Sequence, residues 1–379
     1  MKRMRVNLKL ISLILMVELS GPIIAAEIGG QTPIKFDRVI GQGCYRPIFL
    51  GDSGNRLTRI LTAERRLPNS SSLQNVLIEL GIDGEPSKEI VISNLPESDF
   101  RAAGTVAISE GEFILVGTSS SGTVLASVDG QGKVSKTNLL DGQINFRGVL
   151  RLSREQALIY GAKSGKPFFA LIGRNLAVLK ERQIKIRKPF GVIVRAEYDQ
   201  TAKSLTMILQ ATDDASFSQT EISIVRADLE GRVVASYSVP GFLGDFAKTK
   251  DGIGLLYYGN NNNHQSIKLE FLSNKLKKKW RQEVIDAQYG VIWPRILSPD
   301  GKELIAIAGH GLKLYMVAYT LDAEKRWNYW DAASINAPAF TYFVMAQDNR
   351  LMLLQESKDE TQKYRVDGVS CSQIRALGF

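Results

Sequence analysis

Short apolar stretches recur along the whole chain, and each copy begins at or beside an aromatic residue. In the copy that opens at Tyr289, an apolar run over 291–297 leads into the turn 298–302, and two further runs follow at 303–308 and 312–319. Such runs are rich in β-branched and aromatic residues and are bounded by Gly, Asp and Asn, which indicates β-strands. After the N-terminal segment no long stretch has sustained helical periodicity. The aromatic residues that open the copies are Tyr45, Phe100, Phe146, Phe190, Phe242, Tyr289 and Phe340.

The spacing of these copies predicts the fold class. Successive openers lie 55, 46, 44, 52, 47 and 51 residues apart. Repeats of about 40–50 residues with several short strands each are typical of β-propellers. We therefore predict an all-β fold over residues 27–379, a single seven-bladed propeller with four-stranded antiparallel blades. The first strand of each blade would line the centre, and the next three would step outward.

One turn resembles a known propeller superfamily. The run Leu297-Ser298-Pro299-Asp300-Gly301-Lys302-Glu303-Leu304 is similar to the hairpin between the first two strands of bacterial WD and TolB-like propellers. Its Asp-Gly pair supplies the positive φ values that tight hairpins need. The resemblance implies an architecture for the mature chain and no particular activity, and no copy carries a full WD motif.

The first 26 residues have the layout of a secretory signal peptide. Basic residues from Lys2 to Lys9 precede the apolar stretch 10–17, and Ile24-Ala25-Ala26 is an acceptable cleavage site. A membrane anchor is the alternative, but the apolar stretch is short for a span and Glu18 interrupts it. We expect a bacterial protein that is periplasmic or secreted.

The net charge argues against one class of partner. The whole chain carries +9, and 44 basic against 38 acidic residues remain after residues 1–26 are removed, a net charge of +6. This moderate excess favours anionic partners slightly and does not indicate a nucleic-acid-binding protein. We expect a monomer.

The two cysteines, Cys44 and Cys371, lie near the two ends of the mature chain. In an oxidising compartment an isolated pair usually forms a disulfide; two unpaired buried thiols are the alternative. The last copy is short, with its second and third strands expected at 350–355 and 362–367, so the segment Ile34–Ile40 is expected to complete its sheet. A Cys44–Cys371 bond would then fasten the ring where it closes, with a gain of roughly 5 kcal/mol by the chain-entropy model.

Four links between second and third strands are longer or strongly polar, at residues 65–72, 213–219, 259–265 and 357–360. In four-stranded blades all such links emerge on one face. Loops on a rigid scaffold are the usual sites of recognition, and neutral surface variation is the alternative. The candidate binding residues that these links supply are Arg65, Arg66, Asp213, Asp214, Phe217, Asn261 and His264.

Three arginines suggest a charged rim on that same face. Arg46, Arg101 and Arg147 each directly follow the aromatic opener of their copy. A shared position in the repeat would place the three guanidinium groups around one rim, where they would receive an acidic partner surface or an anionic ligand. The alternative is that they pair with carboxylates between blades. The basic run Lys275–Arg281 falls on the opposite face, as a solvated hairpin or as a contact with a membrane surface or a glycan.

Signals for catalysis are weak. His264 and His310 are the chain's two histidines, so a catalytic triad or a histidine-rich metal site is not expected. Common catalytic motifs are missing, and we expect no cofactor. Asp213-Asp214 suits acid–base work or Ca²⁺, but a solubilising role is more common. Asp245 and Glu197, in central strands, are the best candidates for paired carboxylates.

The sequence thus favours a non-enzymatic periplasmic protein that binds a protein partner through one propeller face. An assembly scaffold and an immunity protein that neutralises a toxin both fit this prediction. The alternatives are an enzyme that acts on a glycan or other anionic polymer in the channel and, less favoured, a protein that binds a small cofactor at its mouth.

Overall fold

The computed structural model describes the backbone of most of the chain beyond the N-terminal segment. The described residues are 36–40, 44–53, 58–66, 73–81, 84–95, 97–213, 220–261, 264–286, 291–310, 313–331, 342–347, 350–357 and 373–378. The expected signal peptide, residues 1–26, lies outside them and stays a prediction. Residues 31–379 cluster as one unit, and none of its described part forms a helix long and apolar enough to cross a membrane.

Within the described residues the strands form seven antiparallel sheets of four strands each. The first three sheets in the chain contain β2 (Cys44–Asp52), β3 (Thr58–Arg66), β4 (Leu73–Gly81) and β5 (Pro86–Val91); β6 (Arg101–Ser109), β7 (Glu112–Ser119), β8 (Gly122–Asp129) and β9 (Val134–Leu140); and β10 (Ile144–Arg151), β11 (Gln156–Lys163), β12 (Lys166–Gly173) and β13 (Val178–Gln183).

The later sheets continue the same order. They contain β14 (Phe190–Asp199), β15 (Ser204–Thr212), β16 (Thr220–Asp228) and β17 (Val233–Pro240); β18 (Phe242–Lys248), β19 (Gly252–Asn261), β20 (His264–Ser273) and β21 (Lys278–Asp286); β22 (Val291–Leu297), β23 (Glu303–His310), β24 (Lys313–Thr320) and β25 (Lys325–Asp331); and β26 (Tyr342–Gln347), β27 (Arg350–Ser357), β28 (Gln373–Gly378) and β1 (Phe36–Ile40).

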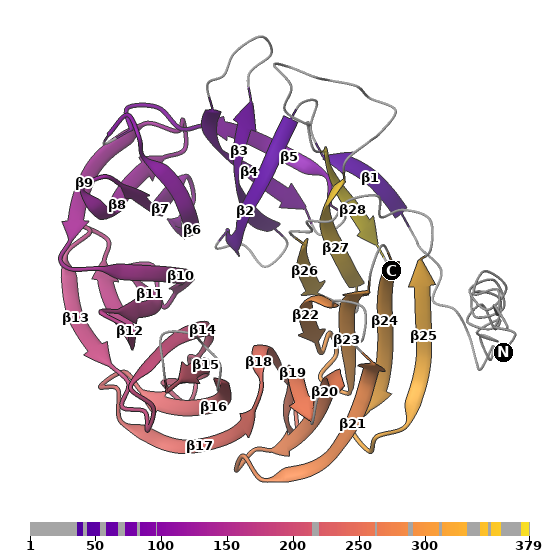
Figure 1. Cartoon of the computed structure of the whole chain (residues 1–379). Coiled ribbons are helices and arrows are strands. Elements are labelled where there is room, and N and C mark those ends of the chain that lie inside the picture. The colour runs from indigo at the N-terminus through magenta and orange to yellow at the C-terminus, as the bar shows by residue number, and fades with distance from the viewer. Residues whose placement is uncertain are drawn as a thin grey trace, which may run out of the picture. The chain divides into compact units, whose positions relative to one another are not determined.

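The sheets follow one another around a centre (Figure 1). The innermost strands are β2, β6, β10, β14, β18, β22 and β26. Inner strands of consecutive sheets contact one another, and β2 of the first sheet contacts β28 of the last. The N-terminal strand β1 is the outer strand of the last sheet, where Ile40 lies opposite Ile374 of β28. The expected completion of the last sheet by the N-terminal segment is therefore observed in the strand pairing.

The middle strands are buried on both faces because each sheet packs between two neighbours. In β11 the residues from Ala157 to Ala162 are all buried, whereas the outer strand β17 alternates exposed and half-buried residues. Continuous apolar runs therefore specify the middle strands, and alternation specifies the outer ones. A hydrogen bond between the buried Thr62 and Thr105 side chains (3.0 Å) joins the first two sheets within this core.

Two strand predictions need correction. The link expected to be extended at 259–265 is a tight hairpin, because β19 runs to Asn261 and pairs there with His264, which begins β20. The third strand of the last sheet was expected at 362–367, but the strand that pairs with β27 in that place is Gln373–Gly378. Residues 362–367 lie outside the described part of the chain.

A β-bulge recurs in the inner strands. In six sheets the pairing between inner and second strand shifts register, at Ile48, Ala103, Arg147 and Val194 and at the residue pairs 243–244 and 293–294. Bulges bend a strand and increase its twist. Near the bulge of β6, a Cβ on Gly104 would lie 2.9 Å from the Phe146 ring and 3.4 Å from Phe49. The inner strands of the first three sheets approach closely through this glycine.

Candidate functional site

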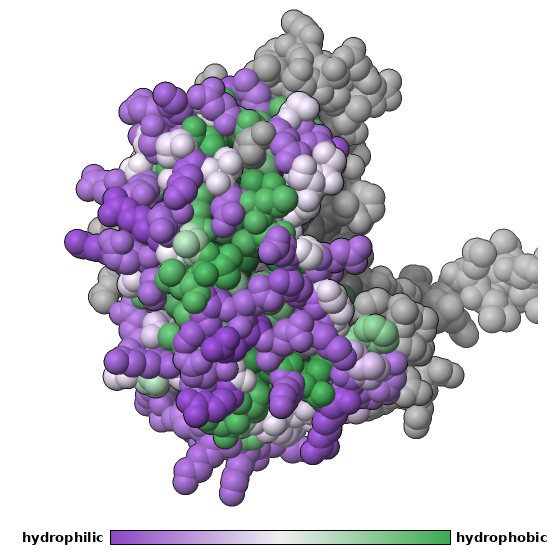
Figure 2. All heavy atoms as spheres, turned by 90° about the vertical axis from the view of Figure 1, so that its left-hand side faces the viewer, coloured by the Kyte–Doolittle hydropathy of each residue, from purple (hydrophilic) through white to green (hydrophobic). Residues whose placement is uncertain are grey.

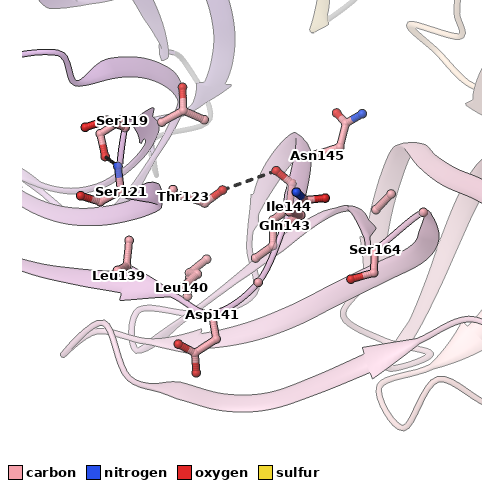
Figure 3. Close-up of a pocket in the computed structure, with 16 residues that line it drawn as sticks. Ser119, Ser121, Thr123, Leu139, Leu140, Asp141, Gln143, Ile144, Asn145 and Ser164 are labelled. Carbon is pink, nitrogen blue, oxygen red and sulfur yellow. Dashed lines mark hydrogen bonds between the residues drawn. The ribbon is translucent and has the colours of Figure 1, made fainter.

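The face on which the inner strands begin, called the N-face here, carries a pocket between the second and third sheets. The pocket has a volume of about 750 Å³. Its walls are residues 118–123, which span the turn from β7 to β8, and residues 139–145, which connect β9 to β10. The turn of the third sheet adds Ser164 and Gly165. Side chains from both sheets surround this hollow, and the Thr123 hydroxyl donates to the Ile144 carbonyl across it (3.5 Å; Figure 3).

Short hairpins leave this pocket open. Ser119 pairs with Gly122, so only Ser120 and Ser121 separate β7 from β8, and Lys163 pairs with Lys166 around Ser164-Gly165. In the second turn both residues have positive φ, 51° at Ser164 and 74° at Gly165, whereas in the first the positive φ falls on Gly122, at 128°. Turns of two residues do not reach across the space between neighbouring sheets, which widens outward. The pocket therefore stays open because the two hairpins that border it are short.

The lining of the pocket is mostly hydroxyl, amide and aliphatic. Leu139 is 50% exposed, whereas Leu140 is buried. Of the lining residues, Asp141 is the acid, and its carboxylate points away from Thr123 and Asn145 (Figure 3). The Ser120 amide is tied to the Asp99 carboxylate (2.8 Å), which holds the first hairpin in place.

Two of the predicted arginines flank the inner end of this pocket. Arg101 is exposed at the start of β6 and lies opposite Thr118, a lining residue. Arg147 is exposed on β10, two residues beyond Asn145. Among the described residues neither guanidinium has a carboxylate within ion-pair distance, and the same holds for Arg187, in the link before β14. The N-face thus presents three cations without an ion-pair partner in the part of the chain that the structure describes.

The predicted common phase of three arginines holds for two of them. Arg46 and Arg101 each stand two residues before the bulge of their inner strand, at Ile48 and Ala103. Arg147 is itself the bulge residue of β10, and Asn145 takes the position equivalent to Arg46 and Arg101. Tyr45 and Phe100 lie three residues before the bulge of their strand, whereas Phe146 lies one residue before it. Counting from Phe146 therefore misplaced Arg147 by two residues. The side chain of Arg46 lies outside the described residues.

Arg65 and Arg66 belong to strand β3 rather than to a loop. The Arg65 side chain forms an ion pair with Glu89 and donates to the Gln74 amide oxygen (2.8 Å). The buried Tyr45 phenol donates to the same Glu89 (2.6 Å). Burial and this hydrogen bond raise the pKa of Tyr45 to about 12. Arg65 is thus tied into the first sheet, and nothing is described of the Arg66 side chain.

The other candidates fall partly outside the description. The Asp213 carboxylate is exposed at the end of β15 and forms an ion pair with Lys188, from the link before β14. Asp214, Phe217 and Cys371 lie outside the described residues, as do the side chains of Cys44, Asn261 and His264. Among described residues no group of three His, Cys, Asp or Glu side chains is arranged to hold a metal ion.

The two central carboxylates share one arginine. Arg195 of β14 donates to Asp245 of β18 (2.5 Å) and to Glu197 (2.9 Å). Asp245 is 1% exposed and also accepts the backbone N–H of Ile296 in β22 (3.1 Å). Burial lowers the pKa of Arg195, but the Asp245 and Glu197 carboxylates outweigh it and raise that pKa. The cluster joins the inner strands of three consecutive sheets.

A second polar cluster joins the outer parts of the fourth and fifth sheets. Glu270 of β20 is fully buried and accepts the hydroxyls of Tyr237 (2.6 Å) and Tyr257 (2.9 Å), and it forms an ion pair with Arg281. Desolvation and the Glu270 carboxylate raise the pKa of Tyr237 to about 12. Because Tyr237 belongs to β17 and the other three residues to the fifth sheet, this cluster also fastens a sheet junction.

The basic run begins in the turn before β21, on the face opposite the N-face. Lys275, Lys277 and Lys278 are exposed, and Lys279 lies over the Phe271 ring at 5.0 Å from its centroid. Arg281 is directed to the buried Glu270. The run therefore combines solvated lysines with one internal ion pair.

Sequence reasoning missed the pocket residues. Ser119-Ser120-Ser121-Gly122 gave a signal, because a run of small polar residues between two apolar strands predicts a tight turn. That signal marks a turn and not a cavity. The sequence also gave no signal for Asn145, because only the bulge at Arg147 shows that Asn145 takes the position equivalent to Arg101.

The comparisons with known proteins concern the fold. No model of a known protein family matches the sequence, and no curated protein matches it. A prolyl endopeptidase structure is 12% identical with a TM-score of 0.52, covering 84% of this chain and 46% of that chain. The β-propeller domain of the Trilobed protease from Pyrococcus furiosus is 13% identical with a TM-score of 0.49, covering 91% of this chain and 94% of that one.

The chain spans about half the length of the endopeptidase, and at this identity the likeness shows the fold alone. Four-stranded antiparallel sheets in chain order around a centre are the architecture of β-propellers. The all-β prediction and the propeller-like architecture are confirmed.

Proposed function

We propose that this chain is a seven-bladed β-propeller, exported to the periplasm or outside of a bacterial cell, that binds a protein partner without catalysis. The partner meets the N-face and presents an acidic surface there. An assembly scaffold and an immunity protein that neutralises a toxin remain the two forms of this function. The observation that carries the proposal is the open pocket flanked by the exposed Arg101 and Arg147.

Strand pairing supports the proposed seven blades and the proposed Cys44–Cys371 disulfide. Each of the seven sheets supplies one blade, and β1 completes the last one. Cys44 begins β2, four residues after Ile40, and Cys371 precedes Gln373, which begins β28. The pairing of Ile40 with Ile374 supports a Cys44–Cys371 bond, because these two residues lie close in sequence to the two cysteines. Thiol counting on the denatured, unreduced protein tests the bond, and two free thiols contradict it.

The central carboxylates favour binding over cleavage of a glycan. A glycosidase needs two carboxyl groups that face each other across the scissile bond. Between Asp245 and Glu197 that space is occupied by the Arg195 guanidinium, which is within 2.9 Å of both. Asp245 is also committed to a backbone amide of the next sheet. Asp245 therefore links the inner strands of three sheets, and Glu197 is held by the same guanidinium.

Charge on the N-face supports an acidic partner. Unpaired surface cations steer oppositely charged proteins and raise the association rate, and salt weakens this effect. Arg101, Arg147 and Arg187 are exposed on this face. Lysines such as Lys277 are exposed on the other face, so the two faces compete as candidates. The N-face is favoured because its cations lie beside a pocket.

Affinity capture from a native extract tests the proposal. We expect the wild-type protein to capture a defined partner, and the double variant Arg101→Glu and Arg147→Glu to lose it. The matched control is Arg154→Glu with Lys277→Glu, which changes the same charge on the other face and should leave capture intact. Capture that survives the first pair and is lost with the second contradicts the proposed face. Turnover of a glycan substrate by the wild type contradicts the absence of catalysis.

A further inference from the structure

The pocket between the second and third sheets is lined by aliphatic residues in one part, its floor, and by hydroxyl and amide side chains in another, its wall. Leu139 is 50% exposed, although its neighbour Leu140 and the lining residue Ala162 are buried. A half-exposed aliphatic side chain inside a concave site gains stability when an apolar group covers it. The floor therefore fits an aliphatic side chain.

Leu139 also lies on the side of the molecule where exposed apolar residues gather. Large exposed apolar side chains on the outer strands β9, β13 and β17 are Leu139, Val178, Leu179, Val233 and Val234. Figure 2 shows apolar residues as a band across this side, with polar residues along both borders. Among these exposed side chains, Leu139 is the one that lines the pocket.

The wall fits a peptide main chain. Ser119, Ser121, Ser164 and Asn145 line the pocket from both sheets. Hydroxyl and amide side chains each donate and accept hydrogen bonds, as an extended peptide requires of its neighbours. Ser164 and Gly165 hold their hairpin at positive φ. A Cβ added to Gly165 would lie 3.1 Å from the Phe190 ring, so this ring lies against the hairpin.

The inner end of the pocket fits carboxylates. Arg101 pairs with the lining residue Thr118, and Arg147 follows Asn145 by two residues. Both guanidinium groups are exposed. An arginine presents a planar fork that binds carboxylate in a bidentate manner. A bound segment would therefore meet an aliphatic floor first and two cations next.

We propose that this pocket holds an extended acidic segment of the protein partner, with an aliphatic side chain on Leu139 and carboxylates at Arg101 and Arg147. The proposal rests on the proposed function and specifies what the partner presents. It makes the pocket between the second and third sheets the centre of the interface, and it makes the surrounding N-face the rim.

Panning a displayed library of random heptapeptides against the full chain tests this directly. We expect the recovered peptides to carry an aliphatic residue flanked by Asp or Glu. Leu139→Glu should weaken a recovered peptide by about tenfold or more, and so should Arg147→Glu. Val234→Glu makes the same change at an exposed apolar residue of β17, and Arg154→Glu reverses a charge away from the pocket; both should leave affinity unchanged.

Several results overturn the inference. Peptides without acids, peptides whose affinity Leu139→Glu does not change, or no enrichment at all would each contradict an acidic segment in this pocket. A neutral oligosaccharide that binds the wild type and not Leu139→Glu would assign the pocket to a sugar instead.

Capture of the native partner separates this inference from the proposed function. If Leu139→Glu captures the partner as well as the wild type does, while the Arg101 and Arg147 double variant does not, the N-face function stands and the pocket inference fails. If both variants capture it fully, both proposals fail.

Discussion

Two sheet junctions of this protein use polar side chains in opposite ways. Between the fourth and fifth sheets, Asp245 and Glu270 are buried, and each carboxylate forms an ion pair with an arginine, Arg195 or Arg281. Between the second and third sheets, the N-face is open, and Arg101 and Arg147 face solvent beside a hydroxyl-lined pocket. A charged side chain that is paired inside the fold is not free to bind a partner. We therefore expect a partner to bind where charged side chains are exposed and unpaired.

The largest effect that distinguishes the two junctions is the loss of a buried carboxylate. Asp245→Ala leaves the Arg195 guanidinium and the Ile296 amide without their shared acceptor, and we expect it to lower the unfolding free energy by about 3 kcal/mol. Denaturant unfolding measures this. Asp251→Ala is the control, because Asp251 is half exposed and 3.9 Å from Lys250, and it should change stability by less than about 0.5 kcal/mol. Equal losses of unfolding free energy in Asp245→Ala and Asp251→Ala would contradict a role of the Arg195 cluster in joining the sheets.

Smaller losses are expected from single hydrogen bonds in the same junction. Tyr237→Phe and Tyr257→Phe each remove one donor to the buried Glu270 and should cost about 1 kcal/mol. Tyr198→Phe, at a half-buried tyrosine of β14 whose hydroxyl has no hydrogen bond within the described region, should be nearly neutral. A larger loss at Tyr198 than at Tyr257 would contradict the role given to Glu270.

Alkaline pH should destabilise the fold through tyrosines in several of its sheets. The pKa values of Tyr45, Tyr160, Tyr237 and Tyr315 are raised to about 12, in each case chiefly by burial. Because the folded pKa lies above the unfolded value of about 10, the stabilisation is complete below pH 10 and is lost as pH rises toward 12. Tyrosinate absorbance followed together with circular dichroism should show late ionisation that coincides with unfolding. Ionisation of every tyrosine near pH 10 in a folded protein would refute it.

The smallest effect belongs to the open junction. Leu139→Glu should leave the unfolding free energy within about 0.5 kcal/mol of the wild type, because its side chain is half exposed. Val234→Glu, at 70% exposure, provides the matched comparison. A loss of 2 kcal/mol or more at Leu139 would make it a core residue and remove the pocket floor from the binding account.

The strands were largely predictable, and the sites were predictable only in part. Apolar runs such as 113–116 and 168–172 mark middle strands, because burial on both faces demands continuous apolar sequence. The third strand of the last sheet was misplaced because Tyr364 and Val366 alternate with polar residues as in a strand, and only pairing with β1 and β27 selects residues 373–378 instead.

Partners that lie far apart in sequence explain the remaining misses. Arg65 and Glu89 are separated by β4, and Arg195 and Asp245 by the three strands β15 to β17, so no local pattern shows that their charges are already paired. The bulge at Arg147 shifts the phase of β10 without a mark in the sequence. A pocket between two sheets depends on turn length and packing together, and the Ser119–Ser121 run reveals only the turn.

Hydrogen–deuterium exchange of the protein, alone and with its captured partner, tests the central claim most directly. The account predicts slower exchange on binding in residues 118–123 and 139–145, with no change in residues 274–279 on the opposite face. Protection confined to 274–279, with the two pocket segments unchanged, would contradict it.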